Sequence, residues 1–199
     1  QGYVLASPLQ LAVMTARVAS GRAVTPRLVR MVNDKELPAV EAPLLDIPPE
    51  FLASVRGGMN AVVNGDHGTG KSSRVVDPTM IFAGKSGTSQ VRNISKAERE
   101  SGVISNDDLP WDRRDHALFV GFAPYDAPRY AVAVVVEHGG GGSTAAAPIA
   151  RDVILRALYG KLPPLDAYPA SQRGRIETML KELPLRDPVT GQPPVKTET

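Results

Sequence analysis

Two apolar runs that lie close together constrain the fold of this chain most strongly. Residues 116–124 read HALFVGFAP and residues 130–138 read YAVAVVVEH, and only the five residues YDAPR separate them. Apolar runs of this length with a short connection predict two adjacent antiparallel strands, joined as a hairpin. The runs are apolar at nearly every position, which indicates that both faces of the sheet are covered.

The N-terminal third of the chain predicts two helices. Ser7 is a suitable N-cap, and Pro8 suits the first helical position. Gly21 suits the position just beyond the end, so a helix is expected over residues 8–20. A second helix is indicated by an apolar stripe with 3,4,3 spacing, which consists of Leu52, Val55, Met59 and Val62.

Two further segments complete the predicted sheet and its cover. Residues 80–91, MIFAGKSGTSQV, have an apolar run and then alternating small and hydroxyl side chains, which is typical of a strand. Residues 93–115 are polar and charged, and we interpret them as a solvated excursion from the core. A third helix, which ends at Gly160, is expected to pack on the strands through Ile149, Ala150, Val153, Ile154, Ala157 and Leu158. The predicted fold class is therefore α+β, an antiparallel sheet with packed helices.

The composition changes after Gly160. Residues 161–199 are rich in proline, with KLPPLDAYPA at the start and RDPVTGQPPVKTET at the end. We therefore divide the chain into a folded part, residues 1–160, and a C-terminal tail, residues 161–199. The tail is predicted to contain one short helix, from Gln172 to Leu183, and its final residues are expected to be poorly ordered.

Charge and composition argue against several classes of protein. The 199 residues include 23 basic and 21 acidic side chains, and no run of Lys or Arg suggests a nucleic-acid partner. There is no cysteine, so neither a disulfide nor a thiolate metal site can form. No stretch approaches the apolar length of a membrane span, and any membrane anchor is expected to lie outside this chain.

Residues 65–73, GDHGTGKSS, match the phosphate-binding P-loop pattern letter for letter. That pattern binds phosphate only where the loop leaves a buried strand and enters a helix. Here the loop follows a predicted helix, and Asp77 before Pro78 disfavours a helix after it. A nucleotide-binding loop is therefore the weaker interpretation, and His67 and Lys71 are expected to face solvent.

Lys85, Ser86, Gly87 and Thr88 lie near the end of the strand predicted over residues 80–91. Ser86 and Thr88 are two residues apart, so their hydroxyls share one face, whereas Lys85 projects to the opposite face. Gly87 between them allows close approach of another chain. Such an edge could bind a peptide by strand addition and hold its anionic end with hydroxyls. Taken alone, however, the tetrapeptide favours a simple solvent-exposed strand end, because Lys-Ser-Gly-Thr occurs by chance in many proteins.

The sequence around this tetrapeptide resembles a known family, the class B penicillin-binding proteins. The likeness rests on four ordered motifs, namely QGY with SPLQLA, AGKSGTSQV, RDHALFVGFAP, and YAVAVVVEHGGGGSTAAAPIARDVI. Within that family the chain is similar to the C-terminal half of the transpeptidase domain of penicillin-binding protein 2, the enzyme of cell elongation. The resemblance implies the transpeptidase fold that penicillin-binding proteins share with β-lactamases.

By that resemblance Lys85, Ser86 and Gly87 occupy the family's third active-site motif, with Ser86 where threonine is commoner. Ser86 and Thr88 would bind the terminal carboxylate of a stem peptide or a β-lactam, and the Thr88 amide would supply half of the oxyanion hole. Lys85 would favour anions and assist proton movement. The implied reaction is D,D-transpeptidation, in which a serine attacks the D-Ala-D-Ala carbonyl and neither a cofactor nor a metal is needed.

Two of the family's motifs are missing from this sequence. No serine is followed three residues later by lysine, which is the pattern of the family nucleophile. The Ser-x-Asn motif is absent too, because Ser105 and Asn106 are adjacent. We therefore expect the nucleophile on an N-terminal segment that precedes this chain in the family order. This chain is expected to supply one wall of the active site.

The resemblance also implies partners and a location. The partners are the peptidoglycan stem peptide, β-lactam antibiotics, the N-terminal remainder of the same protein and a membrane glycosyltransferase of the elongation machinery. The location is the periplasmic face of the bacterial inner membrane. Alternatives are a non-catalytic penicillin sensor, a structural module of a cell-wall complex, and a β-lactamase, because a shared fold does not fix the function.

Four aromatic or imidazole side chains remain as other candidates. His67, His116 and His138 are too scattered in sequence to indicate a metal site, so structural roles are expected. His138 and the glycines at 139–142 could line a substrate cleft or simply end a strand. Trp111 is expected to pin its own loop, with contact to a partner as the alternative.

Overall fold

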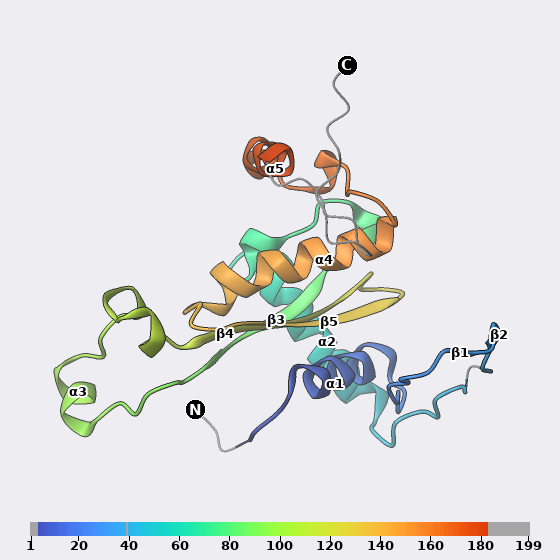
Figure 1. Cartoon of the computed structure of the whole chain (residues 1–199), viewed down its shortest axis with the longest axis horizontal. Coiled ribbons are helices and arrows are strands. Elements are labelled where there is room, and N and C mark those ends of the chain that lie inside the picture. Colours follow the sequence, from blue (N-terminus) through green and yellow to red (C-terminus); the bar gives the residue numbers. More distant parts are fainter. Residues whose placement is uncertain (1–3, 39, 183–199) are drawn as a thin grey trace.

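The structure is a computed structural model that describes residues 4–38 and 40–182. A sheet of three strands forms its centre, with helices on either side (Figure 1). A smaller sheet of two short strands lies on an arm between the first two helices. The helices are α1 (Pro8–Ser20), α2 (Pro49–Asn64), α3 (Lys96–Ser101), α4 (Ala147–Tyr159) and α5 (Ala170–Glu182), and the strands are β1 (Met31–Val32), β2 (Lys35–Glu36), β3 (Ala83–Ser89), β4 (His116–Ala123) and β5 (Tyr130–Val136).

The three-stranded sheet confirms the predicted hairpin. β4 and β5 pair antiparallel, from Ala117 with Val136 to Ala123 with Tyr130. β3 pairs antiparallel with the other side of β4, so the strand order is β3-β4-β5. The fold class is therefore α+β with an antiparallel sheet, as predicted.

The strand predicted over residues 80–91 is shorter than expected. β3 covers Ala83–Ser89, and every one of its residues has a partner on β4. Residues 78–80 instead form a short 3-10 turn, in which the Asp77 carboxylate accepts from the Thr79 N–H at 2.8 Å. The length that can pair with β4, rather than the apolar run, sets the ends of β3.

Helices cover both faces of the sheet, as the continuous apolar runs predicted. α1 packs on β4 and β5 and α2 packs on β3, and both lie below the sheet in Figure 1. α4 packs on β4 and β5 from the opposite side, above the sheet in Figure 1. We call these two sides of the sheet the α1/α2 face and the α4 face. None of the helices in the described ranges could span a membrane, and α2, with 16 residues, is the longest of them.

The two N-terminal helices are present, with the predicted end signals on α1. The Ser7 hydroxyl accepts from the Gln10 N–H at 3.3 Å, and the Gln10 side chain accepts from the Ser7 N–H at 2.7 Å. Gly21 ends α1 in the left-handed conformation, with φ 69°, that favours glycine. The predicted stripe of α2 is only partly covered, because Met59 is buried but Val55 is 51% exposed.

α4 packs through a stripe that differs in part from the predicted one. The predicted members Ile149 and Val153 are 45% and 53% exposed. Arg151 is buried instead, which an apolar pattern cannot indicate, because a charged side chain enters a core only when its donors have partners. The buried residues of α4 are Ala147, Ala150, Arg151, Ile154, Leu155 and Leu158.

The partners of Arg151 connect α4 to the segment that follows it. Its Nε donates to the Asp152 carboxylate and its Nη1 donates to the Gln172 amide oxygen, both at 2.8 Å. The guanidinium lies over the Tyr168 ring, 4.8 Å from the ring centre. Gln172 belongs to α5, so the predicted short helix is present and begins at Ala170, two residues earlier than predicted. Its expected last residue and the expected disorder of the final residues lie outside the described residues.

Two clusters of buried apolar side chains stabilise the sheet. The larger lies between the sheet and α4 and includes Phe82 and Phe119, whose ring centres are 5.6 Å apart. Tyr168 and Ile176, from beyond α4, belong to the same cluster. The smaller cluster lies between the sheet and the two N-terminal helices and consists of Ala19, Met59, Ala83 and Phe122.

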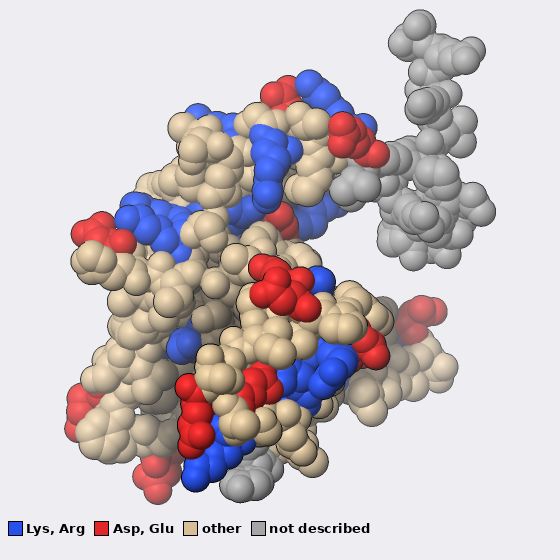
Figure 2. All heavy atoms as spheres, turned by 90° about the vertical axis from the view of Figure 1, so that its left-hand side faces the viewer, with Lys and Arg blue, Asp and Glu red and all other residues tan. Residues whose placement is uncertain are grey.

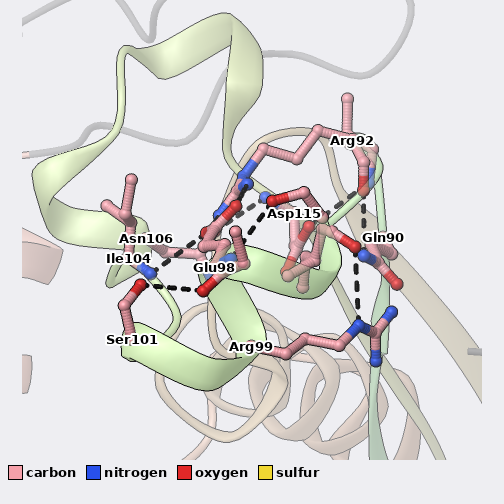
Figure 3. A network of polar contacts seen from close by, with 12 residues as sticks. Gln90, Arg92, Glu98, Arg99, Ser101, Ile104, Asn106 and Asp115 are labelled. Carbon is pink, nitrogen blue, oxygen red and sulfur yellow. Dashed lines mark hydrogen bonds and ion pairs between the residues drawn. The ribbon is translucent and has the colours of Figure 1, made fainter.

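The segment between β3 and β4, residues 90–115, leaves the sheet as the predicted excursion does (Figure 1). A polar network orders it (Figure 3). Arg92 donates twice to the Glu98 carboxylate, at 2.5 and 2.7 Å, and the Ile104 N–H donates to it at 3.2 Å. These bonds, chiefly those from Arg92, lower the pKa of Glu98 to about 2.

Asp115 connects this network to the end of the sheet. Its carboxylate accepts from the Val91 N–H at 3.2 Å, and its own N–H donates to the Asn106 amide oxygen at 2.9 Å. Its carbonyl oxygen accepts from the Gly140 N–H at 2.8 Å. The start and the end of the excursion are therefore joined to each other and to the turn after β5.

Candidate active site

β3 brings Lys85, Ser86, Gly87 and Thr88 to one edge of the central sheet. β4 pairs with one side of β3, and no strand in the part of the chain that the structure describes pairs with the other side. An edge strand presents unpaired backbone groups that can bind an extended peptide. The tetrapeptide therefore lies where a peptide could be added to the sheet.

The side chains of this tetrapeptide divide between the two faces, as predicted. Ser86 lies directly opposite Phe119, which belongs to the buried cluster beneath α4. Thr88 is two residues further and shares the α4 face. Lys85 lies opposite Val120, which packs against the smaller cluster on the α1/α2 face. The Lys85 ammonium therefore lies on one face of β3, and the Ser86 and Thr88 hydroxyls lie on the other.

Lys85 borders a hollow of about 450 Å³ on the α1/α2 face. Its ammonium donates to the Ser86 carbonyl oxygen at 2.7 Å, and the side chain is exposed. Apart from Lys85 and one threonine, the side chains around the hollow are apolar. The lining residues are Met14, Thr15, Val18, Val55, Gly58, Met59, Val62, Lys85 and Val120. A cation therefore stands at the rim of an uncovered apolar surface.

Thr88 borders a different hollow, of about 670 Å³, at the end of β3. Its lining residues are Val4, Leu5, Ala6, Leu11, Thr88, Ser89, Gln90, Val91, Arg92, Asn93 and Leu118. Lys85 is not among them, so the two residues border separate hollows. The polar residues Gln90, Arg92 and Asn93 were not among the predicted site residues, although they follow Thr88 closely in the sequence.

Gly142, the last of the glycines at residues 139–142, lies against the backbones of Gly87 on β3 and Leu118 on β4. A Cβ on Gly142 would lie 2.5 Å from the Gly87 carbonyl oxygen and 2.3 Å from the Leu118 carbonyl oxygen, so only glycine fits there. A Cβ on Gly87 would meet the Leu118 Cβ at 3.5 Å, which is an ordinary contact. The strict need for glycine thus lies at Gly142 rather than at Gly87.

The loop at residues 65–73 does not have the structure of a phosphate-binding loop. It follows α2, and its amides are used within the loop and by α2, since the Gly70 N–H donates to the Val62 carbonyl oxygen at 2.9 Å. The Ser73 N–H donates to the Gly70 carbonyl oxygen at 2.8 Å. Lys71 donates to the Asp66 carbonyl oxygen at 3.2 Å. These bonds leave no set of convergent amides for a phosphate.

The structure brings together two of the three histidines and the tryptophan. The ring centres of His116 and His138 are 4.7 Å apart, and those of His138 and Trp111 are 4.5 Å apart. Sequence spacing alone did not indicate this contact. The pairing of β4 with β5 does imply the contact between the two histidines, because His116 begins β4 and His138 follows the end of β5. No group of His, Asp or Glu suited to a metal occurs among the described residues.

Charged side chains of both signs surround this end of the molecule. Figure 2 shows the side that lies at the left of Figure 1, and there the Lys and Arg side chains are interspersed with Asp and Glu. Asn106, from the imperfect Ser-Asn pair, accepts within the excursion, where its amide oxygen accepts from the Asp115 N–H and its carbonyl oxygen accepts from the Leu109 N–H. That contact gives Asn106 a structural role in the loop.

Comparison with known proteins defines the class of this chain. Residues 1–155 match the penicillin binding protein transpeptidase domain. The chain therefore belongs to the penicillin-binding protein transpeptidase family, as its four motifs indicated.

Particular relatives agree with this class. Peptidoglycan D,D-transpeptidase MrdA of Haemophilus influenzae is 38% identical over 174 residues, which are 84% of this chain and 26% of that protein. The structure of Pseudomonas aeruginosa PBP2 in complex with WCK 5153 matches with a TM-score of 0.58 at 36% identity, over 85% of this chain and 35% of that chain. Helicobacter pylori PBP2 in complex with MreC matches with a TM-score of 0.60 at 32% identity, over 80% of this chain and 26% of that chain. The chain thus spans about a quarter of the Haemophilus protein.

Proposed function

We propose that this chain forms one wall of the active site of a peptidoglycan D,D-transpeptidase. The observation that carries the proposal is the edge strand β3, with two hydroxyls on one face, an ammonium on the other and a free edge that no strand in the described ranges pairs with. The relatives support it, because the curated proteins that match over most of this chain are named peptidoglycan D,D-transpeptidases.

In the proposed reaction, a serine oxygen attacks the carbonyl carbon between two D-alanines and the terminal D-alanine leaves with a proton. The resulting ester then passes its acyl group to an amine of a second stem peptide, which releases the serine. Ser86 and Thr88 would bind the terminal carboxylate, and the Thr88 N–H would stabilise the oxyanion, a contact whose loss typically costs about 100- to 1000-fold in rate. Lys85 would attract the anionic substrate and assist proton transfer. This chemistry requires neither a cofactor nor a metal.

The serine itself would come from the N-terminal remainder of the protein. Two features of the described residues support this placement. The apolar hollow beside Lys85 is open, and the outer edge of β5 has no strand partner in the described ranges. A segment that covered the hollow would lie next to Lys85, where a serine could reach a peptide bound along β3.

The proposed ligands follow from the reaction, and the relatives give them some support. Stem peptides and β-lactams are the ligands of the site, and the Pseudomonas relative was solved in complex with WCK 5153. We further propose a membrane glycosyltransferase of the elongation machinery as a partner, and the periplasmic face of the inner membrane as the location. The Helicobacter relative was solved in complex with MreC, so an assembly with other proteins has a precedent among the relatives.

The test is a chimera in which residues 1–182 of this chain replace the matching segment of Haemophilus influenzae MrdA. Intact-mass measurement should show one penicillin added to the chimera. Lys85→Ala should slow this acylation by about 100-fold or more, because proton transfer by a positioned side chain typically contributes at least that much. The matched control is Lys161→Ala, at an exposed lysine beyond α4.

The outcomes separate the alternatives. A folded chimera, shown by cooperative thermal unfolding, that gains no penicillin would overturn the proposal. Rapid release of hydrolysed penicillin would indicate a β-lactamase instead. Stable acylation without transfer of a D-Ala-D-Ala peptide to an amine acceptor would indicate a sensor.

A further inference from the structure

Three aromatic rings contact one another, in tilted and edge-to-face geometry, at the end of the sheet where the excursion begins. His116 contacts His138, with ring centres 4.7 Å apart and ring planes at 68°. His138 contacts Trp111, with ring centres 4.5 Å apart and ring planes at 58°. We call His116, His138 and Trp111 the ring stack. The indole is its outer member, and Trp111 is 63% exposed.

Hydrogen bonds fix the two histidines of the ring stack. The His138 N–H donates to His116 Nδ1 at 2.9 Å, so that nitrogen of His116 carries no proton. His138 Nδ1 lies 2.9 Å from the Arg114 carbonyl oxygen, which can only accept, so Nδ1 of His138 carries a proton and donates it. His138 also has a positive φ, 54°, which is uncommon for a residue other than glycine. The ring that supports Trp111 is therefore held in one orientation.

The backbone of Trp111 is ordered, and its ring packs on His138. It begins a short 3-10 turn in which the Arg114 N–H donates to the Trp111 carbonyl oxygen at 3.1 Å. Asp112 and Arg113, the next two residues, are exposed. A large flat ring that is already ordered, and that still has most of its surface in water, can bind a ligand with little further loss of conformational freedom.

The position of the ring stack relates it to the proposed peptide site. Thr88 pairs with Ala117 and Ser89 pairs with His116, so the ring stack begins about one strand residue, roughly 3.4 Å, beyond Thr88. A stem peptide with its carboxylate on Ser86 and Thr88 could continue along β3 past Ser89 toward the ring stack. In peptidoglycan the other end of that peptide carries the glycan.

We propose that Trp111, supported by His138, binds a sugar ring of the glycan strand to which the stem peptide is attached. One face of a pyranose is a flat layer of C–H groups, which packs on an indole, and its rim carries hydroxyls. Asp112 and Arg113, the next two residues in the chain, offer an acceptor and donors for such hydroxyls. This inference rests on the proposed function and adds a substrate contact to it.

The experiment uses the chimera and two acyl donors, the stem peptide linked to its disaccharide and the same peptide without sugars. Trp111→Ala should raise KM for the glycopeptide by about 3- to 10-fold, the effect expected for loss of one aromatic contact. The kcat for the glycopeptide, and kcat and KM for the bare peptide, should stay within about 2-fold of the values for the parent chimera. Trp111→Phe should retain most of the affinity.

Controls separate this inference from the folding of the loop and from the proposed function. Tyr130→Ala removes another exposed aromatic ring, at the opposite end of β5, and should change neither donor. Acylation by labelled penicillin should be equal in the parent chimera and Trp111→Ala. Loss of acylation in the parent chimera contradicts the proposed function, whereas normal acylation without discrimination between the donors contradicts the glycan contact alone.

A second measurement does not need turnover. Saturation-transfer NMR should show transfer of saturation from the parent chimera to the free disaccharide, and Trp111→Ala should remove most of it. An equal loss of affinity for both acyl donors would mean that Trp111 contacts the peptide or only orders the excursion. Unchanged transfer in Trp111→Ala would overturn the glycan contact.

Discussion

The two faces of the central sheet differ in how completely this chain covers them. On the α4 face, Phe119 and Ile154 are fully buried in a cluster that extends as far as α5. On the α1/α2 face, the buried cluster has only four members, and Met14 and Val55 remain about half exposed beside an open hollow.

This difference shows which part of the fold the chain completes by itself. Contacts within the chain close the α4 face, whereas the α1/α2 face keeps apolar surface that another segment could bury. β3 lies on the boundary between the two, with Ser86 on the closed side and Lys85 on the open side. This chain therefore packs the side of the candidate site that carries Ser86. The side that carries Lys85 depends on a further segment for its cover.

The largest expected effect is on the α4 face. Phe119→Ala should lower the free energy of unfolding of this chain by about 3–5 kcal/mol, since it removes a fully buried ring. Val55→Ala, on the α1/α2 face, should cost less than about 1 kcal/mol, because that side chain is half exposed. Equilibrium urea unfolding measures both changes. If Phe119→Ala and Val55→Ala lowered the free energy of unfolding equally, the proposed difference between the two faces would be wrong.

The next effect tests the segment proposed to cover the α1/α2 face. The N-terminal segment of Haemophilus influenzae MrdA, added in trans at about 100 times its Kd, should stabilise this chain by about 2.7 kcal/mol. Val55→Asp should abolish that gain by placing a charge in the contact. Val153→Asp is the matched control, because Val153 is equally exposed, 53% against 51%, but lies on α4. Thermal unfolding of the parent chain and of both variants, with and without the segment, measures this gain in stability. If Val55→Asp and Val153→Asp lost the gain equally, the segment would not bind specifically to the α1/α2 face.

The smallest effect is local to the excursion and should leave both faces unchanged. Bonds from Arg92 lower the pKa of Glu98 from 4.5 to about 2. A carboxyl whose pKa is lower in the folded state stabilises that state above its unfolded pKa, and the contribution is lost as the pH falls through the folded pKa. The Ile104 amide, which donates to Glu98, should therefore shift in NMR spectra as the pH falls from 4.5 toward 2.

The glutamine variant supplies the control for this pH dependence. Glu98→Gln should lack the shift of the Ile104 amide, because the amide side chain does not titrate in that range. Amides of Phe119 and Val120 on β4 should stay constant in both proteins. If they move in the same range, the excursion and the sheet unfold together rather than separately.

Local patterns predicted much of the scaffold. The ends of α1 were predictable because Ser7 and Gly21 act through bonds to their own neighbours. The β4–β5 hairpin was predictable because two apolar runs with a short connection can pair in few other ways. The four positions of the candidate site were placed correctly on an edge strand, and alternation predicted that Lys85 faces away from Ser86.

The remainder depends on contacts between distant segments. Arg151 enters the core of the α4 face only because Asp152 and Gln172 accept its hydrogen bonds, and Gln172 comes from another helix. The apolar pattern therefore predicted that Ile149, rather than Arg151, lies in the buried stripe of α4. The ring stack was not predicted either, because Trp111 reaches His138 only after the excursion has folded.

The two ends of the excursion meet at one pair of residues, which affects how its length can vary among proteins of this fold. Ser89 lies directly opposite His116, so residues 90–115 leave and rejoin the sheet at the same rung. The entropy cost of closing a loop rises only slowly with its length, so residues can be inserted or deleted there without shifting β3 against β4. Evolution can thus exchange the residues that lie beyond the end of β3 while β3 itself stays in place.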